Sequence, residues 1–254
     1  MYKCHYPAKP TKTARGVKRS PLHNALAAQN ACFRDVSGWE AADWYAAEGE
    51  TTEVGPLTWG KHHWFPNWAA EHQACREGVV LIDMSFMSKF EVCGKDAGKV
   101  LNRLSTANVD GDSGEITYTQ WLNPSGRVEA DLTVTKLAED RFMVVATDTM
   151  HRHVEALMNR QASPEDHFFV TDVTGAYAQI NLQGPKSREL LQRLTSADVS
   201  NESFPFRAAR ELDIGYARAL CTRYAQGTQH KHKHKHKHKH KHEEKTRLQA
   251  CLRA

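Results

Sequence analysis

The chain has 254 residues and 40% hydrophobic content, which is enough to bury the core of one large domain or two small ones. Its formal net charge of +4 is uneven, because residues 224–254 hold nine Lys and Arg against two Glu and leave −3 on residues 1–223. The body of the chain therefore gives no support to nucleic-acid binding.

The six cysteines are scattered along the chain, with no C-x-x-C pair and no zinc-ligand spacing. This usage favours reduced thiols in an intracellular compartment, and we expect no metal site. No apolar run approaches the length of a membrane span, and no signal-peptide core is present. Residues 1–34 are basic and lack acids, as an organelle transit peptide would be.

Two helices flank an aromatic-rich stretch in the first part of the chain. Residues 1–21 are rich in Pro, Lys and Thr and indicate an extended connector. The Ser-Pro pair at 20–21 is typical of a helix N-cap and predicts a helix through about Cys32. Seven aromatic side chains then crowd residues 39–68, and either the chain's own core or a neighbouring domain must cover them. A second helix is predicted from Asn67 to Gly78, where the glycine ends it.

From residue 81 onward, strand and helix signals alternate with a hairpin among them. The predicted elements are strands at 89–92, 142–146, 168–173, 177–182 and from about 218–222, helices at 96–104, 151–158 and 185–194, and a hairpin at 116–137. This order argues against a purely parallel, doubly wound sheet. It predicts an α+β fold with mixed, largely antiparallel sheets and flanking helices.

The hairpin places an acid beside an aromatic residue. If Asn123–Gly126 form the turn, Leu122 pairs with Arg127, and the register puts Tyr118 directly opposite Asp131. Aliphatic and polar residues alternate along the second strand, so Asp131 points away from the aliphatic face. An acid in such a place is usually just solvated, so the pattern alone does not assign it a function.

The pattern of strands and helices stops after Arg223. A strict His-Lys alternation follows, a low-complexity segment that cannot bury a core, and we expect the tail to be disordered. A translated simple nucleotide repeat would give the same alternation, which favours a tail read from non-coding or frame-shifted sequence. The alternative is a selected element, whose seven His would bind divalent metals loosely and whose six Lys would bind polyanions.

Four sequence blocks occur in a defined order: IDMSFMSKFEV at 82–92, YTQWLNPSGRVEADLTV at 118–134, NLQGPKSRELL at 181–191 and SNESFPF at 200–206. Together they resemble the folate-binding aminomethyltransferase fold. More narrowly, they resemble the C-terminal tetrahydrofolate half of sarcosine and dimethylglycine dehydrogenases, which is related to the glycine-cleavage T-protein. Residues 13–45 are similar to the segment that joins the flavin-bearing half of those enzymes to the folate half.

The resemblance implies three segments. Residues 1–55 correspond to the linker from the flavin-oxidoreductase central region, residues 56–223 to a truncated folate-binding domain, and residues 224–254 to the tail. No G-x-G-x-x-G follows a predicted strand, so we expect FAD only in a flavin half that this chain lacks. The sequence after Arg223 also lacks the Gly- and Glu-containing strand and the C-terminal barrel that the family would have there. The implied location is intracellular: the mitochondrial matrix in a eukaryote, otherwise the cytoplasm.

The resemblance also implies a set of site residues. The family places a catalytic acid at the end of the hairpin motif, immediately before Leu, and this position is Asp131 here. The residues implied around the pterin and aminobenzoyl rings are Met87, Tyr118, Met143, Val145 and Thr147. Met143 and Val145 face the Asp131 side only if the loop after Leu137 has an odd length, and each could equally be a core residue.

These implications lead to competing functions. The leading hypothesis is the tetrahydrofolate-binding portion of a sarcosine or dimethylglycine dehydrogenase-like enzyme, which transfers a one-carbon unit from an iminium derived from an N-methyl amine to tetrahydrofolate. We expect a folate and a flavin domain as partners, and neither nucleic acid nor a membrane. The alternative is a non-catalytic interaction module resembling the regulatory subunit of pyruvate dehydrogenase phosphatase, which would not need the carboxylate of Asp131. A third hypothesis is a metal or polyanion binder that uses the His-Lys tract.

Overall fold

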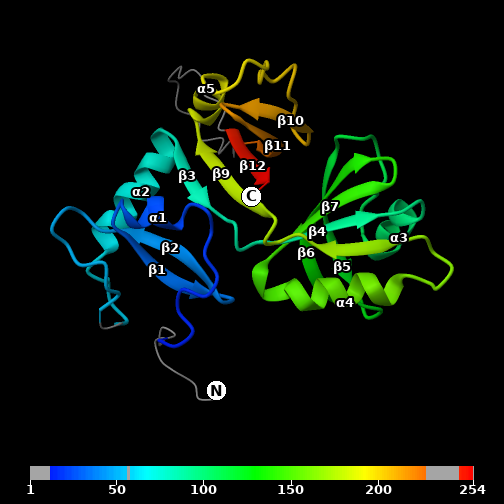
Figure 1. Cartoon of the computed structure of the whole chain (residues 1–254), viewed down its shortest axis with the longest axis horizontal. Helices are drawn as coiled ribbons and strands as arrows, with labels where there is room; N and C mark the ends of the chain where they lie inside the picture. Colours follow the sequence, from blue (N-terminus) through cyan, green and yellow to red (C-terminus); the bar gives the residue numbers. More distant parts are fainter. Residues whose placement is uncertain (1–11, 56–57, 227–245, 254) are drawn as a thin grey trace, which may run out of the picture.

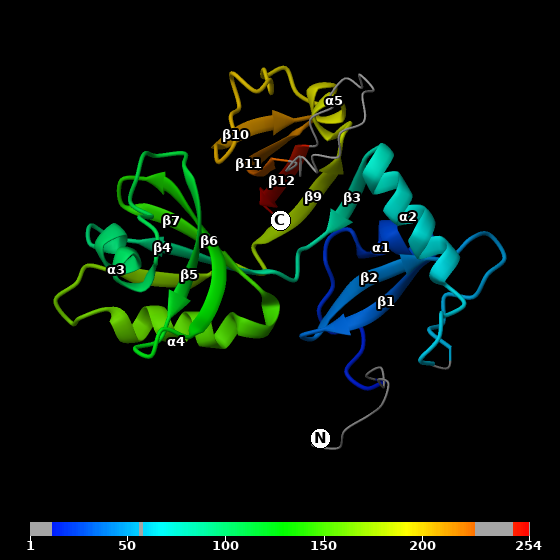
Figure 2. The same ribbon diagram turned by 180° about the vertical axis from the view of Figure 1, so that it is seen from behind.

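The computed structural model describes residues 12–55, 58–226 and 246–253. Figure 1 shows three groups of elements: an N-terminal lobe, a sheet with two helices at residues 88–172, and a second sheet that sits above and between them. Figure 2 shows the same arrangement from behind. Every pairing between named strands in this part of the chain is antiparallel, which confirms the predicted α+β class with largely antiparallel sheets. The predicted division at residues 55 and 223 stays a prediction.

The N-terminal lobe contains a two-stranded hairpin between helices. Its elements are α1 (His23–Ala27), β1 (Ala31–Val36), β2 (Trp39–Tyr45) and α2 (Phe65–Glu77). The prediction of a helix through Cys32 is wrong, because α1 stops at Ala27. Asn30 adopts a left-handed backbone with φ of 58°, and the chain then turns into a strand that buries Cys32. The second predicted helix is confirmed: it ends at Gly78, whose N–H donates to the carbonyl of Ala74 at 2.8 Å.

The aromatic residues of this lobe are only partly covered. Trp44 is fully buried and stacks on Trp64, with ring centroids 6.2 Å apart. Trp59 and Trp68 stay exposed over 80% and 49% of their surface. The chain's own core therefore accounts for part of the cluster and leaves the rest accessible.

The first large sheet has the strand order β5-β6-β7-β4-β8. Its elements are β4 (Ser88–Cys93), α3 (Ala97–Leu104), β5 (Ile116–Leu122), β6 (Val128–Ala138), β7 (Arg141–Ala146), the 3-10 turn η1 (Asp148–Met150), α4 (His151–Gln161) and β8 (Phe169–Asp172). One face packs against α3 and α4 in the largest hydrophobic cluster, to which Phe90, Val134 and Phe142 belong. The opposite face carries the polar and mixed residues.

The second large sheet has the order β10-β11-β12-β9-β3. Its elements are β3 (Val80–Asp83), β9 (Tyr177–Gly184), the helix α5 (Ser187–Gln192), β10 (Ala209–Ile214), β11 (Ala217–Gln226) and β12 (Thr246–Arg253). A smaller cluster around Phe204 and Leu212 forms its core. In the described part of the chain, no helix is long and apolar enough to cross a bilayer.

The strand β12 differs from the expected disordered tail. Its eight residues pair with Tyr177–Gly184 of β9, and its other edge pairs with β11. Residues 246–253 are therefore a central strand. Their alternation and β-branching are weak, so the sequence did not predict a strand, and the strand forms because both neighbouring edges offer backbone partners. The His-Lys tract up to residue 245 lies outside the described residues.

Candidate functional site

The predicted hairpin is formed by β5 and β6. The N–H of Asn123 donates to the carbonyl of Arg127 and that of Gly126 donates back to Asn123, both at 2.9 Å. Gly126 has a φ of 74°, which a side chain would disfavour. The turn is thus where the sequence places it, with a three-residue loop between Asn123 and Arg127.

The register differs from the prediction by two residues. Asp131 lies opposite Gln120, and Tyr118 lies opposite Thr133. One residue of the shift comes from the three-residue loop, and the other from a bulge beside Trp121. Because a shift of two preserves which face each side chain occupies, Tyr118 and Asp131 still share a face.

The two side chains meet diagonally across the strands. The hydroxyl of Tyr118 donates to Oδ2 of Asp131 at 2.8 Å, and this hydrogen bond raises the pKa of Tyr118. Both residues are exposed, Tyr118 over 60% of its surface. Within the described residues, Tyr118 is the one hydrogen-bond partner of the Asp131 carboxylate.

Met143 and Val145 lie on this same face of the sheet. Val145 pairs with Thr133 of β6, and Met143 with Thr135. Their neighbours on the opposite face, such as Val144, belong to the main core. The loop parity that the sequence could not fix thus places both residues on the Asp131 side. Met143 is buried and Val145 is half-buried.

Met87 and Thr147 lie at the edge of this face, one residue outside the paired strands. Ser88 and Leu132 both pair with Ala146, so continuing the ladder by one residue brings Met87, Thr147 and Asp131 into one row. Met87 and Thr147 are half-buried. The six predicted site residues therefore occupy a single polar face, and their roles stay a prediction.

Lys89 is a residue of this face that sequence reasoning missed. It is fully buried, and its Nζ donates to the carbonyls of Ser85 and Met87 at 2.9 and 2.7 Å. It thereby fixes the loop that carries Met87. The alternation of β4 indicates only that Lys89 leaves the apolar face, and its burial depends on the loop that covers it.

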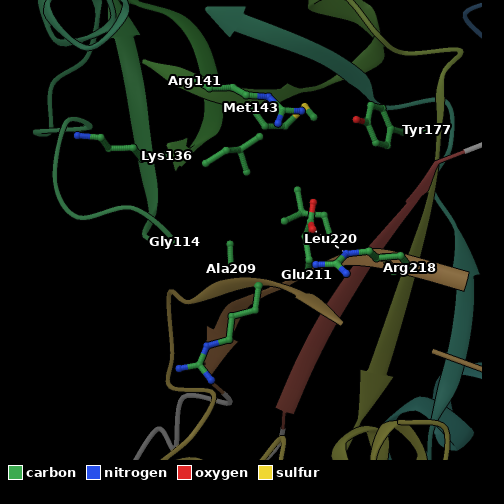
Figure 3. Close-up of a pocket in the computed structure, with 12 residues that line it drawn as sticks. Gly114, Lys136, Arg141, Met143, Tyr177, Ala209, Glu211, Arg218 and Leu220 are labelled. Carbon is green, nitrogen blue, oxygen red and sulfur yellow. Dashed lines mark hydrogen bonds and ion pairs between the residues drawn. The ribbon is translucent and has the colours of Figure 1, made fainter. Parts of the chain in front are cut away.

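A cavity of about 440 Å³ lies between this face and the second sheet. Figure 3 shows Met143 and Arg141 on one side and Leu220, Glu211 and Arg218 on the other, with Tyr177 at the margin. Two ion pairs flank the cavity, Arg141 with Glu91 at 2.6 Å and Arg218 with Glu211 at 2.8 Å.

Asp131 does not line this cavity. It lies six residues along β6 from Leu137, a distance of about 20 Å in a strand. The cavity and the Tyr118–Asp131 pair are therefore two ends of one surface. The predicted acid therefore lies outside this cavity.

A second polar arrangement resembles a hydrolytic triad. His151 contacts Oγ of Ser88 through Nδ1 at 3.0 Å and Oδ2 of Asp172 through Nε2 at 3.1 Å. Both ring nitrogens are thus occupied, and Ser88 is 1% exposed. A nucleophile must be accessible to its substrate, and Ser88 is buried, so this set links β4, α4 and β8 structurally. In the described residues, no group of three or more His, Cys, Asp or Glu could hold a metal ion.

Comparison with known proteins gives one family. Residues 22–225 match the model of the GCVT N-terminal domain, and the match begins inside the segment predicted as a linker. The sequence is 41% identical to the 4-methylaminobutanoate oxidase (formaldehyde-forming) of Paenarthrobacter nicotinovorans, over 87% of this chain and 27% of that protein.

Two mitochondrial proteins of Mus musculus are more distant. The regulatory subunit of pyruvate dehydrogenase phosphatase is 28% identical over 87% of this chain and 26% of its own length. Sarcosine dehydrogenase is 27% identical over 81% of this chain and 26% of its own length. The chain spans about a quarter of the length of these three relatives.

A solved structure supports the fold. The glycine cleavage system aminomethyltransferase T from Bartonella henselae superposes with a TM-score of 0.66, covering 93% of this chain and 54% of that one at 21% identity. This confirms the predicted aminomethyltransferase fold. Together with the match over residues 22–225, it shows that the chain belongs to the GCVT N-terminal domain family.

Proposed function

We propose that this chain binds tetrahydrofolate on the face that carries Tyr118 and Asp131, as the folate-binding portion of an N-demethylating enzyme. The observation that carries the proposal is the exposed Asp131 carboxylate, which Tyr118 holds at 2.8 Å on an open face. Met143 and Val145 lie on the same face and offer an apolar wall for a flat ring. This combination of an apolar wall and one acceptor group suits the pterin.

When bound, tetrahydrofolate would supply amine nitrogens that accept a one-carbon unit. Asp131 would favour the positive charge that develops near those amines and would take up the proton they release. Tyr118 would hold the Asp131 carboxylate in one orientation through its hydroxyl. Positioned acid–base groups contribute roughly 10²- to 10⁴-fold in rate, so one carboxylate is enough to matter.

The one-carbon unit would come from an iminium that a flavin domain produces from an N-methyl amine. The names of two relatives, an oxidase described as formaldehyde-forming and a sarcosine dehydrogenase, support this class of chemistry. Both relatives are much longer than the matched region, which leaves room in them for such a domain. We therefore propose FAD and a flavin domain on the rest of the polypeptide or on a partner, in an intracellular compartment.

The alternative is a non-catalytic interaction module like the regulatory subunit that this chain also resembles. An interaction module needs no carboxylate on an open sheet face. The Tyr118–Asp131 hydrogen bond therefore favours the folate-binding proposal.

Calorimetric titration of the whole chain with tetrahydrofolate tests the binding step. We expect saturable binding that Asp131→Asn leaves nearly intact, because asparagine keeps the size and one acceptor oxygen. Asp131→Ala and Tyr118→Phe should weaken binding, since the first removes the acceptor group and the second removes the hydroxyl that orients it. When a flavoenzyme supplies the iminium, Asp131→Asn should reduce methylenetetrahydrofolate formation about 100-fold or more and release formaldehyde instead.

Matched controls come from the second sheet. Tyr216 is fully exposed and Asp213 is exposed on β10, so Tyr216→Phe and Asp213→Asn repeat the same chemistry away from the site. They should change neither binding nor coupling. The proposal fails if the chain does not bind tetrahydrofolate, or if the control variants weaken binding as much as Asp131→Ala and Tyr118→Phe do.

A further inference from the structure

A groove of about 600 Å³ lies on the N-terminal lobe between β2, α2 and β3, outside the proposed folate face. We call it the acidic groove. Its apolar lining includes Tyr45, Trp68, Cys75, Leu81 and Ile82, and its acids are Asp43, Glu71 and Asp83. Leu81 and Trp68 are about half exposed and Ile82 is 36% exposed. The groove thus joins accessible apolar surface to several carboxylates.

One wall of the groove is an unpaired sheet edge. β3 pairs with β9 along one side, and it is the last strand of its sheet in the described part of the chain. Consecutive residues of a strand point to opposite faces, yet both Leu81 and Ile82 are accessible. Proteins normally protect such edges with charges, proline or a covering element, so an apolar edge is a place for another strand to pair.

The permanent charges of the groove are all negative, and His72 is the one basic side chain among the described residues that line it. Among the described residues that line it, none is Lys or Arg. Asp43 has a cation nearby, Arg34 at 3.1 Å, whereas the Glu71 carboxylate accepts, within the described part of the chain, only the N–H of Tyr45 at 3.0 Å. Burial raises the pKa of Glu71, as expected for a carboxylate without a paired cation. A basic partner would relieve this desolvation.

We propose that β3 is a strand-addition site for an extended segment of a partner polypeptide, with alternating apolar and basic side chains. The main chain of the segment would extend the sheet at the β3 edge. Its apolar side chain would pack against Trp68 and Leu81, and its Lys or Arg would lie near Glu71. This inference does not depend on folate binding.

A second copy of this chain is a poorer occupant. A symmetric dimer through β3 would bring two acidic grooves together, and like charges across an interface are unfavourable. The charge of the groove therefore favours a basic partner over self-association.

Fluorescence polarisation with a labelled hexapeptide, acetyl-RVLVRV-amide, tests the proposal on the whole chain. We expect saturable binding below about 1 mM that weakens as salt screens the charges. Hydrogen exchange should show new protection at residues 80–83, which binding to the groove without strand pairing would not give. The acidic peptide EVLVEV and a version of the basic peptide with alternate amides N-methylated should both bind at least about tenfold more weakly.

Variants of the chain distinguish peptide binding in the acidic groove from non-specific binding elsewhere on the surface. Trp68→Ala and Glu71→Gln should each weaken peptide binding, Trp68→Ala by about tenfold. Trp59→Ala is the matched control, because Trp59 is exposed but does not line the groove, and it should have no effect. The proposal is overturned by no binding up to 1 mM, by equal binding of the acidic peptide, by an equal effect of Trp59→Ala, or by a dimer that already protects residues 80–83.

Discussion

At the scale of single residues, Glu40 is the most strongly stabilised carboxylate of the N-terminal lobe. It accepts hydrogen bonds from the Arg15 guanidinium at 2.8 and 2.5 Å and from the Gly16 N–H at 2.6 Å. The Arg15 hydrogen bonds lower its pKa from 4.5 to about 2. A carboxylate with a lowered pKa in the folded state adds stability above its unfolded value, and this stability is lost as the pH falls toward 2.

We therefore expect Glu40→Gln to destabilise the lobe by about 1–3 kcal/mol at pH 7. The difference from the parent should shrink between pH 4.5 and pH 2, because the parent then loses the same charge. Urea unfolding followed by tryptophan fluorescence across this range measures it. Glu53→Gln is the control at an exposed carboxylate. A difference that stays constant down to pH 2.5 would contradict the assignment.

The buried Lys89 gives a second residue-scale prediction. Lys89→Met keeps the length of the side chain but leaves the carbonyls of Ser85 and Met87 without their donor. We expect a loss of about 1–3 kcal/mol in the free energy of unfolding and faster amide exchange at residues 84–87. Lys95→Met, at an exposed lysine, should do neither. Unchanged exchange at 84–87 would show that Lys89 does not fix this loop.

The Tyr118–Asp131 pair and the buried Lys89 show how much a sequence pattern can predict about single residues. The alternation of β6 was sufficient to place Asp131 on the polar face and to bring Tyr118 near it, because both lie in one local hairpin. The alternation could not predict the three-residue loop or the bulge beside Trp121, and the predicted register was therefore wrong by two residues. Burial of Lys89 depends on a loop outside its strand, and no local signal separates it from an exposed lysine such as Lys95.

At the scale of elements, β12 decides whether the second sheet is complete. It pairs with β9 on one edge and β11 on the other. A chain ending at Gln226 would leave two inner strand edges open, which favours aggregation and loss of the small core around Phe204. We expect faster exchange of amides in β9 and β11 and increased light scattering. The first large sheet should be unaffected.

A second variant separates the contribution of β12 to stability from any contribution of the His-Lys tract. Replacing residues 227–245 by a Gly-Ser linker of equal length should keep the exchange pattern of the parent, since β12 remains. If truncation and replacement have the same effect, or if truncation has none, β12 does not stabilise the sheet.

Helices and strands differ in how well the sequence predicts them, because some follow local periodicity and others do not. The helices α2, α3 and α4 and the strands from β4 to β9 follow local periodicity, and the structure confirms most of them within a few residues. The strands β1, β2, β3, β10 and β12 escaped prediction. The strands β3 and β12 pair with segments far away in the chain, which a local window does not contain. The strands β1, β2 and β10 lie in local hairpins, but their buried residues do not alternate regularly, so periodicity gives no strand signal there.

At the scale of the whole molecule, the buried residues fall into separate clusters. The largest has sixteen residues and lies under the first sheet. Among the residues whose side chains the structure describes, the second has six and the one in the N-terminal lobe three, Cys32, Trp44 and Ala46. Because hydrophobic stabilisation scales with the buried apolar area, these parts should differ in stability. A single cooperative transition is therefore not expected.

Tryptophan fluorescence can resolve this difference. Five of the six tryptophans lie at residues 39–68 in the N-terminal lobe, and only Trp121 lies in the largest cluster. Fluorescence thus reports mainly the lobe, whereas far-UV circular dichroism reports both large sheets. We expect the fluorescence midpoint at a lower urea concentration than the dichroism midpoint. Trp121→Phe should lower the dichroism midpoint and leave the fluorescence midpoint in place, while coincident transitions in the parent chain would show that the lobe and the sheets unfold as one unit.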